Sequence, residues 1–136
     1  DAWDGYWACR ELVFDALLEH GVNPLVLAGD THNAWAFNLA NDQAQPVAVE
    51  LGTPGVNSPG LETYLATEPD VLARAMQDAS SELYAVDTAQ RGWSEVVLTP
   101  ESATNQWHFV STVLDRDFTV TSADKQICMA GDKKFS

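Results

Sequence analysis

The sequence is poor in cationic side chains: 7 Lys and Arg residues stand against 20 Asp and Glu residues, which gives a formal net charge of −13. Nucleic acids are bound mainly through cations that displace counterions from phosphates, so this composition predicts no nucleic-acid-binding surface. The negative charge also repels anionic membranes and small phosphate esters. A phosphate ester could approach only where bound cations reverse the local field.

Cysteine is scarce, and long apolar runs are missing. Cys9 and Cys128 lie outside any Cys-x-x-Cys motif, so they form either one disulfide or two buried thiols, of which we favour the thiols. No run reaches the roughly 18 apolar residues that a membrane-spanning helix needs. No signal peptide is recognisable, and Asp1 begins in what reads as the middle of a domain, so we expect a fragment or a processed chain.

Motifs for a protein nucleophile are also missing. The sequence holds neither a Gly-x-Ser-x-Gly elbow nor a glycine-rich loop that would cradle a phosphate. Cys9 falls on the apolar stripe of a predicted helix, which argues against a cysteine hydrolase.

The residues that are present predict one α/β domain over residues 1–136. With 136 residues and 46% hydrophobic side chains, the chain is long enough to bury a core. Residues 7–20 predict a helix that ends at Gly21, a suitable C′ residue. Its buried stripe at helical spacing is expected to comprise Cys9, Leu12, Val13, Ala16 and Leu17. A second helix is predicted over residues 69–80, with Thr67 as its cap.

Short apolar or alternating segments predict the strands. Residues 25–28 read as a buried strand and complete a helix–strand unit, and residues 34–40 and 47–51 read as a β-hairpin. Residues 52–60 are rich in glycine and proline, which predicts a rigid irregular loop. The remainder is predicted to be β-rich, with strands over residues 83–86, 93–99, 107–114, 118–121 and 127–130. Pro100-Glu101-Ser102 is expected to join the strands over 93–99 and 107–114 as an antiparallel meander. Residues 131–136 are expected to form a frayed tail.

The segment that ends in Gly29-Asp30-Thr31-His32 carries the strongest indication of chemistry. Gly29 would let the chain leave the strand through backbone angles that other residues avoid. Asp30 and His32 would then lie at the carboxyl end of a strand, and their i, i+2 spacing in an extended chain would point both side chains the same way. A carboxylate and a neutral imidazole suit iron, zinc, manganese or calcium. The alternative interpretation is a solvated polar turn, because a two-residue motif is a weak signal.

The other two histidines favour structural roles. His20 is predicted at a helix C-terminus, where its charge would interact favourably with the helix dipole. His108 lies between Trp107 and Phe109 in a predicted strand, and packing in a sheet accounts for it.

Several segments, in order along the chain, carry a family resemblance. They are Trp3-Asp4-Gly5-Tyr6 with Arg10, Val26-Leu27-Ala28-Gly29-Asp30-Thr31-His32, Trp35-Ala36, Glu50, Thr53-Pro54, Ser58-Pro59-Gly60, Asp87, Arg91-Gly92-Trp93, Leu98-Thr99-Pro100-Glu101 and Trp107. This order resembles that of the PhoD-type alkaline phosphatases, in which a tyrosine is commoner at position 93. The Gly-Asp-x-His motif is the most specific part of the resemblance.

The resemblance implies a metallophosphoesterase, of which this chain would be the C-terminal part of an α-β-β-α sandwich with a multinuclear metal site at the strand ends. Such enzymes are associated with calcium and iron, are typically exported, and hydrolyse phosphomonoesters and phosphodiesters by metal-activated water. By resemblance, Asp30 and His32 are metal ligands and catalytic residues, and Asp4 and Asn33 are positions near the substrate.

The family's earlier metal motifs lie N-terminal to the matched region. The isolated chain is therefore expected to bind metal weakly and to lack phosphatase activity. An alternative from another class is an acidic binding or structural module that keeps the fold without catalysis. Sheets that lack their continuation would expose edges that pair with other chains, so we also expect a homo-oligomer.

Overall fold

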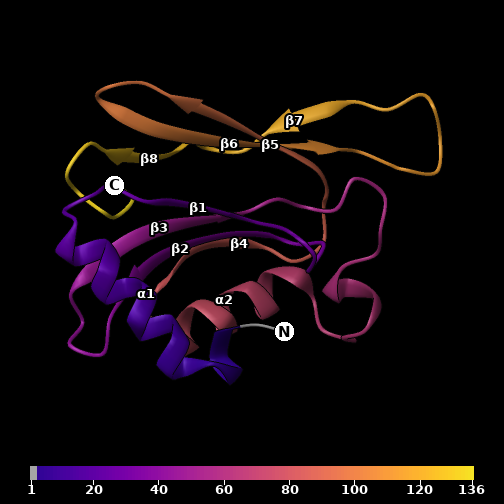
Figure 1. The fold of residues 1–136 in the computed structure, drawn as a ribbon. Coiled ribbons are helices and arrows are strands. Elements are labelled where there is room, and N and C mark those ends of the chain that lie inside the picture. Colours follow the sequence, from indigo (N-terminus) through magenta and orange to yellow (C-terminus); the bar gives the residue numbers. More distant parts are fainter. Residues whose placement is uncertain (1–2) are drawn as a thin grey trace.

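The computed structural model describes residues 3–136, except for the side chain of Asp4, and places two helices and two sheets in layers (Figure 1). The first sheet has the strand order β1-β3-β2-β4, in which β1 and β3 are parallel and the other neighbours are antiparallel. Its strands are β1 (Leu25–Ala28), β2 (Ala34–Ala40), β3 (Pro46–Gly52) and β4 (Leu83–Asp87). The helices α1 (Trp7–Glu19) and α2 (Pro69–Ala79) lie together on one face of this sheet.

The second sheet covers the opposite face of the first. Its central strand β6 pairs with β5 along one edge and with β7 and β8 along the other, antiparallel throughout. These strands are β5 (Arg91–Leu98), β6 (Ser102–Val110), β7 (Val120–Ser122) and β8 (Gln126–Met129). Short 3₁₀ turns, η1 (Trp3–Gly5) and η2 (Leu61–Thr63), complete the elements. The predicted α/β class is confirmed, and the described residues form an α-β-β arrangement.

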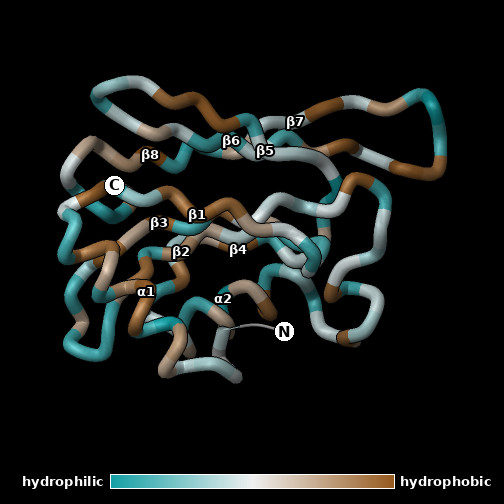
Figure 2. Tube along the Cα trace, viewed as in Figure 1, coloured by the Kyte–Doolittle hydropathy of each residue, from teal (hydrophilic) through white to brown (hydrophobic). Residues whose placement is uncertain are grey.

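The main core lies between the two sheets. Because side chains alternate across each strand, the first sheet presents one set of small and branched residues inward and the second sheet presents aromatic ones. The fully or nearly buried members are Ala34, Ala36, Val49, Leu51, Trp107, Phe109, Cys128 and Phe135. Each large apolar side chain buried there stabilises the fold by roughly 1.5–3 kcal/mol. Figure 2 shows that β1 is largely hydrophobic, whereas the loop between β6 and β7 mixes hydrophobic and hydrophilic residues.

Helix α1 buries a different face from the one predicted. Leu12 is 71% exposed and Cys9 is exposed, whereas Arg10 and Phe14 are buried against the first sheet. The Nη2 atom of Arg10 donates to both carboxylate oxygens of Glu82 at 3.1 and 3.2 Å, and the guanidinium lies 4.3 Å from the ring centroid of Phe14. With Arg10 and Phe14 buried, four of the five residues of the predicted stripe are exposed, and only Leu17 packs against the core.

Glu50 of β3 belongs to the same charged cluster. Burial raises the pKa of the Glu50 carboxyl, the charge of Glu82 raises it further, and the nearby Arg10 opposes both effects. The cluster therefore holds a partly buried carboxylate whose ionised form carries a desolvation cost.

The C-terminal tail is anchored, although a frayed tail was predicted. Phe135 is 5% exposed and packs in the main core. The backbone N–H of Phe135 donates to Asn38 Oδ1 at 2.8 Å, and the N–H of Ser136 donates to the carbonyl of Ile127 at 2.9 Å. One aromatic residue among polar neighbours is enough to dock the segment.

Several other element boundaries differ from prediction: β5 begins at residue 91 and not at 93, and β7 begins at residue 120 and not at 118. Strand β6 begins at Ser102 and ends at Val110, earlier at both ends than the predicted strand over residues 107–114. The N-cap of α2 is Glu68, without a side-chain cap hydrogen bond, in place of the predicted Thr67. Helix α1, the β2–β3 hairpin and the positive φ of 62° at Gly21 confirm the corresponding predictions. Within the described part of the chain, neither helix is long and apolar enough to cross a membrane.

Candidate functional site

Two loops meet at the carboxyl ends of the parallel strands β1 and β3. The backbone N–H of Thr53 donates to the carbonyl of Ala28 at 3.0 Å, which extends the β1–β3 pairing beyond the strands. Loop 29–33 and loop 53–60 therefore lie side by side at the carboxyl ends of β1 and β3, on the right in Figure 1. Open α/β sheets bind their ligands at the carboxyl ends of their strands.

Loop 29–33 reverses direction through two left-handed residues. Asp30 has φ 74° and His32 has φ 62°, whereas Gly29 has no left-handed φ. The expectation that Gly29 supplies the unusual angles is therefore wrong. The argument from i, i+2 spacing in extended chain fails with it, because neither residue is extended. Aspartate and histidine tolerate this conformation better than most side chains.

Hydrogen bonds stabilise this loop from within and from β2. The N–H of Thr31 donates to the carbonyl of Gly29 at 2.9 Å, and the indole Nε1 of Trp35 donates to Thr31 Oγ1 at 2.8 Å. The carboxylate of Asp30 lies exposed at the surface. The loop thus has a hydrogen-bonded backbone and a solvent-exposed acidic side chain.

His32 is held from both its backbone and its ring. Its Nδ1 lies 2.8 Å from the carbonyl oxygen of Pro59, and its own carbonyl accepts the N–H of Gly55 at 3.0 Å. A carbonyl only accepts, so Nδ1 must donate, and the neutral imidazole then carries its free lone pair on Nε2. Metal-ligating histidines commonly use such a carbonyl to set the tautomer. A Cβ on Gly55 would come within 3.1 Å of the Cβ of His32, so a larger residue there would push the two loops apart by a few tenths of an ångström.

Asn33 ties the same loop into the interior. Its side chain is fully buried, and its Oδ1 accepts the N–H of Leu61 at 3.3 Å. Because that donor fixes the amide orientation, Nδ2 is the atom that faces Gly60, where it is buried without a hydrogen-bond partner. Asn33 was predicted near the substrate; that role stays a prediction, and the structure places its side chain as an internal anchor.

Glu62 and Arg91 extend this anchor to the second sheet. An ion pair joins Glu62 Oε1 to Arg91 Nη2, Arg91 Nη1 donates to the carbonyl of Ala89 at 2.8 Å, and the N–H of Gly60 donates to Glu62 Oε1 at 3.3 Å. Burial alone would raise the pKa of Glu62, but the bonds from Arg91 and from the backbone N–H groups outweigh it and leave this pKa below its ordinary value. Sequence reasoning missed the pair because 29 residues separate its members. No local pattern in the sequence indicates the pair.

Among the side chains that the structure describes, which do not include that of Asp4, Asp30 and His32 are the predicted metal ligands of this site. Across residues 3–136, no group of three or more His, Cys, Asp or Glu side chains is arranged to hold a metal ion. Asp30 and His32 come from one tied loop and carry oxygen and nitrogen donors of the kind that metal ions bind. The side chain of Asp4, predicted near the substrate, lies outside the described residues.

The remaining histidines lie elsewhere. His20 is the exposed C-cap of α1. His108 lies on the outer face of the second sheet, stacked on Trp93 with ring centroids 5.1 Å apart. Its ring nitrogens contact Glu95 at 3.0 Å and Ser122 at 2.8 Å. These contacts give His108 a structural explanation within the sheet.

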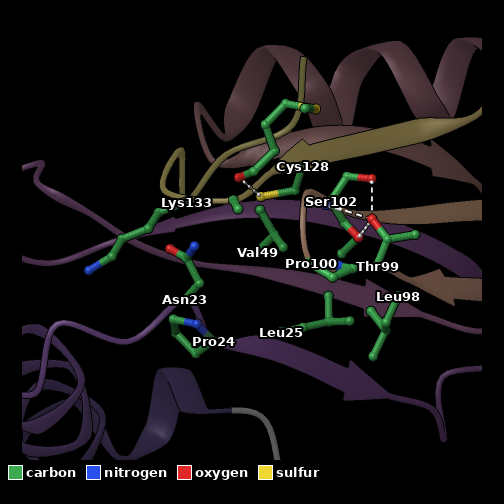
Figure 3. Close-up of a pocket in the computed structure, with 13 residues that line it drawn as sticks. Asn23, Pro24, Leu25, Val49, Leu98, Thr99, Pro100, Ser102, Cys128 and Lys133 are labelled. Carbon is green, nitrogen blue, oxygen red and sulfur yellow. Dashed lines mark hydrogen bonds between the residues drawn. The ribbon is translucent and has the colours of Figure 1, made fainter.

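A small pocket at the opposite end of β1 holds the second thiol. Figure 3 shows this pocket of about 280 Å³, in which Leu25, Val49 and Cys128 are among the lining residues. Burial raises the pKa of the Cys128 thiol, which contacts the carbonyl of Met129 at 3.7 Å. Both cysteines are free, as favoured, but Cys9 is exposed and not buried. The pocket lies at the start of β1, away from the loops that carry Asp30 and His32.

Comparisons with known proteins agree with this architecture. The family model for PhoD-like phosphatases matches residues 1–107. A search of curated proteins found no match. A solved structure described as "Structure of PhoD" aligns with 99% of this chain at a TM-score of 0.79 and 19% sequence identity, a likeness of fold alone, and the chain spans 26% of that chain's length. Because the family match covers residues 1–107 of 136, the chain belongs to the PhoD-like phosphatase family.

Proposed function

We propose that this chain forms part of a metal-dependent phosphatase that hydrolyses phosphate monoesters and diesters. The observation that carries the proposal is the contact between His32 Nδ1 and the Pro59 carbonyl at 2.8 Å. That contact leaves the Nε2 lone pair for a metal and fixes the ring orientation before the metal arrives. Membership of the PhoD-like phosphatase family supports phosphate esters as the substrates.

In this proposal, Asp30 and His32 would each supply one ligand to a site that binds calcium and iron. Metal ions there would polarise a phosphoryl oxygen and lower the pKa of a bound water. The chain's own contribution is the rigid loop: its hydrogen bonds to Trp35 and Pro59 hold the two donors in place. Bound cations would also offset the net charge of −13, which otherwise repels an anionic substrate.

The remaining ligands would come from outside residues 1–136. We propose that the isolated chain binds metal weakly and does not turn over phosphate esters. The competing proposal, an acidic binding or structural module, rests on the finding that the described side chains include no group of three or more residues arranged to hold a metal ion. The two proposals differ in whether the full-length protein holds metal through His32.

The test is His32→Ala in the full-length protein, with metal content by elemental analysis and turnover of a chromogenic phosphate ester. His20→Ala is the matched control, because His20 is an exposed histidine at a helix end. Loss of bound metal together with at least a hundredfold loss of turnover, in the His32 variant alone, is expected for a ligand. Unchanged metal content and turnover would contradict the role of His32, and a full-length protein without stoichiometric metal would favour the acidic module.

Two further proposals concern the oligomeric state and the cellular location of the protein. The isolated chain should form homo-oligomers, because it exposes Leu12 on α1 and Leu27 on the edge strand β1 at 71% and 65%. A monomer by light scattering at micromolar concentration would contradict this. We also propose export to the periplasm or the cell exterior, which fractionation of cells that express the full-length protein would check.

A further inference from the structure

The face of helix α1 that points away from the first sheet is apolar. Arg10 and Phe14 are buried on the side of the sheet, and the opposite side carries a stripe at i, i+3, i+4 and i+7 spacing. In this outer stripe the largest side chain, Leu12, is 71% exposed. No element that the structure describes covers the stripe (Figure 1). Its members, all exposed, are Cys9, Leu12, Val13 and Ala16.

The outer stripe carries no charged side chain, in a chain with a net charge of −13. The only basic residue of α1, Arg10, is buried on the other face, and the exposed residues Asp15 and Glu19 of α1 are acidic. An anionic membrane surface or a nucleic acid therefore finds no cation on α1. The occupant that fits the stripe is a partner with an uncharged apolar surface of its own.

The outer stripe is complementary to itself, because its residues are arranged symmetrically about the midpoint between Leu12 and Val13. Two copies of α1 packed antiparallel would set Leu12 against the partner's Val13, and Cys9 against the partner's Ala16. The larger side chains then meet at the centre and the small ones at both ends, so the helices can approach closely. Cys9 lies at one end of this contact, where a small reagent still reaches its thiol. Self-complementarity about a twofold axis is the requirement of an isologous dimer interface.

We propose that the outer stripe is the contact surface of a homodimer, in which α1 of one copy packs antiparallel against α1 of the other. This proposal rests on the homo-oligomer proposed above, to which it assigns a surface, and it does not depend on the phosphatase chemistry. One helix pair buries less than the roughly 1,600 Å² of a standard interface, so the dimer should be weak. Each copy carries a net charge of −13, so added salt should strengthen the dimer by screening the repulsion between the copies.

The antiparallel arrangement determines which thiols of the two copies can be joined. The two Cys9 residues would lie about 10 Å apart along the helix axis, because Cys9 faces position 16 of the partner and each residue advances the helix by about 1.5 Å. That offset exceeds the Cα separation of a disulfide, which is roughly 4.4–6.8 Å. A cysteine introduced at position 16 would instead face the partner's Cys9. A parallel helix pair would bring the two Cys9 residues together.

The first test is oxidative cross-linking of the full-length protein carrying Ala16→Cys, with peptide mapping to identify the residues that are joined. A disulfide between Cys9 of one copy and position 16 of the other is expected in this variant. Asp15→Cys is the matched control, because Asp15 is exposed at nearly the same height on α1 but points to another side of the helix. Equal cross-linking in the control, or a disulfide between the two Cys9 residues of the wild-type protein, would overturn the antiparallel contact.

The second test measures the dimer without cross-links, by sedimentation of the full-length protein over a range of concentrations. Leu12→Glu should raise the dimer Kd at least about tenfold, because it buries a charge in the contact, whereas Leu114→Glu, at a loop residue that is 95% exposed, should leave the Kd unchanged. A protein that stays monomeric at micromolar concentration would overturn both this contact and the homo-oligomer. An oligomer that Leu27→Glu dissociates and Leu12→Glu does not would overturn this contact alone, and the assembly would then involve β1.

Discussion

Replacing Asn33 by aspartate tests the internal anchor of the candidate site more sharply than removing the side chain does. The Asn33 side chain is fully buried, its Oδ1 accepts the N–H of Leu61, and its Nδ2 faces Gly60. The Nδ2 atom and Glu62 Oε2 lie 2.4 and 2.9 Å from the point that a Cβ on Gly60 would occupy. Asn33→Asp therefore places a second carboxylate oxygen beside a buried glutamate oxygen, without a cation of its own.

Asn33→Ala and Asn33→Asp are expected to lower the free energy of unfolding by different amounts. Asn33→Ala removes one hydrogen bond and leaves the Leu61 N–H without its acceptor, which costs about 1–3 kcal/mol. Asn33→Asp keeps the acceptor but buries an unpaired charge, a change that costs about 3–5 kcal/mol. For a domain of this size each kcal/mol lowers Tm by roughly 3–5 °C. We expect Asn33→Asp to be the less stable variant at pH 7, although it is the closer match in shape.

The stability of Asn33→Asp should change with pH in a predictable direction. Burial and the neighbouring Glu62 would raise the pKa of the introduced carboxyl in the folded state, so protonation should restore stability as the pH falls through that raised value. Glu62 itself has a lowered pKa, and its ion pair with Arg91 is lost only when the pH falls through that lower folded value. About pH 5 therefore separates the two effects.

The assay is urea unfolding followed by tryptophan fluorescence at pH 7 and pH 5, on the wild-type chain and both variants. The expected result is a deficit of Asn33→Asp relative to Asn33→Ala at pH 7 that shrinks or reverses at pH 5. Equal stability of the two variants at pH 7, or a deficit that does not change with pH, would refute the reasoning about this anchor.

Three further predictions concern single positions. Gly60→Ala should destabilise the fold by about 1–3 kcal/mol, because the added Cβ would lie 2.4 Å from the buried Nδ2 atom of Asn33. Thermal unfolding checks this, with Gly5→Ala as the control, because nothing lies within 4 Å of a Cβ added there. Glu50→Gln should be more stable than wild type at pH 8, because burial raises the pKa of Glu50 and its ionised form therefore costs stability. Wild type should recover that stability at low pH, so a stability gain of the variant that is the same at pH 8 and pH 4 would contradict this prediction. Ellman's reagent should titrate one thiol, Cys9, at once and Cys128 only on unfolding, since burial raises the pKa of Cys128; two fast thiols would disprove the assignment.

The sequence predicted the elements well where local periodicity reports burial within one element. The alternation over residues 34–40 and 47–51 predicted the β2–β3 hairpin, and Gly21 predicted the end of α1. The same method chose the wrong face of α1. Apolar spacing favoured Leu12, but Arg10 is the buried residue, because its partner Glu82 lies 72 residues away and cannot be read from a helical pattern.

The candidate site divides in the same way. The Gly-Asp-Thr-His motif and its place after an apolar strand could be read from the chain, and they led to the family. The backbone conformation of this motif could not be read from the sequence, because the left-handed φ angles fall on Asp30 and His32 and not on the glycine. Those angles are held by contacts with the neighbouring loop, which no local propensity encodes.

By itself, the sequence determined the α/β class, the order of helices and strands, and the family to which the chain belongs, because hydrophobic periodicity and a short motif are local properties. Only the tertiary structure decided how the site is held: the Pro59 carbonyl that orients the His32 ring comes from 27 residues away, and the Glu62–Arg91 ion pair joins the loops to the second sheet. Such partners meet only when the two loops pack at one sheet edge, and their geometry is a consequence of folding and not of spacing.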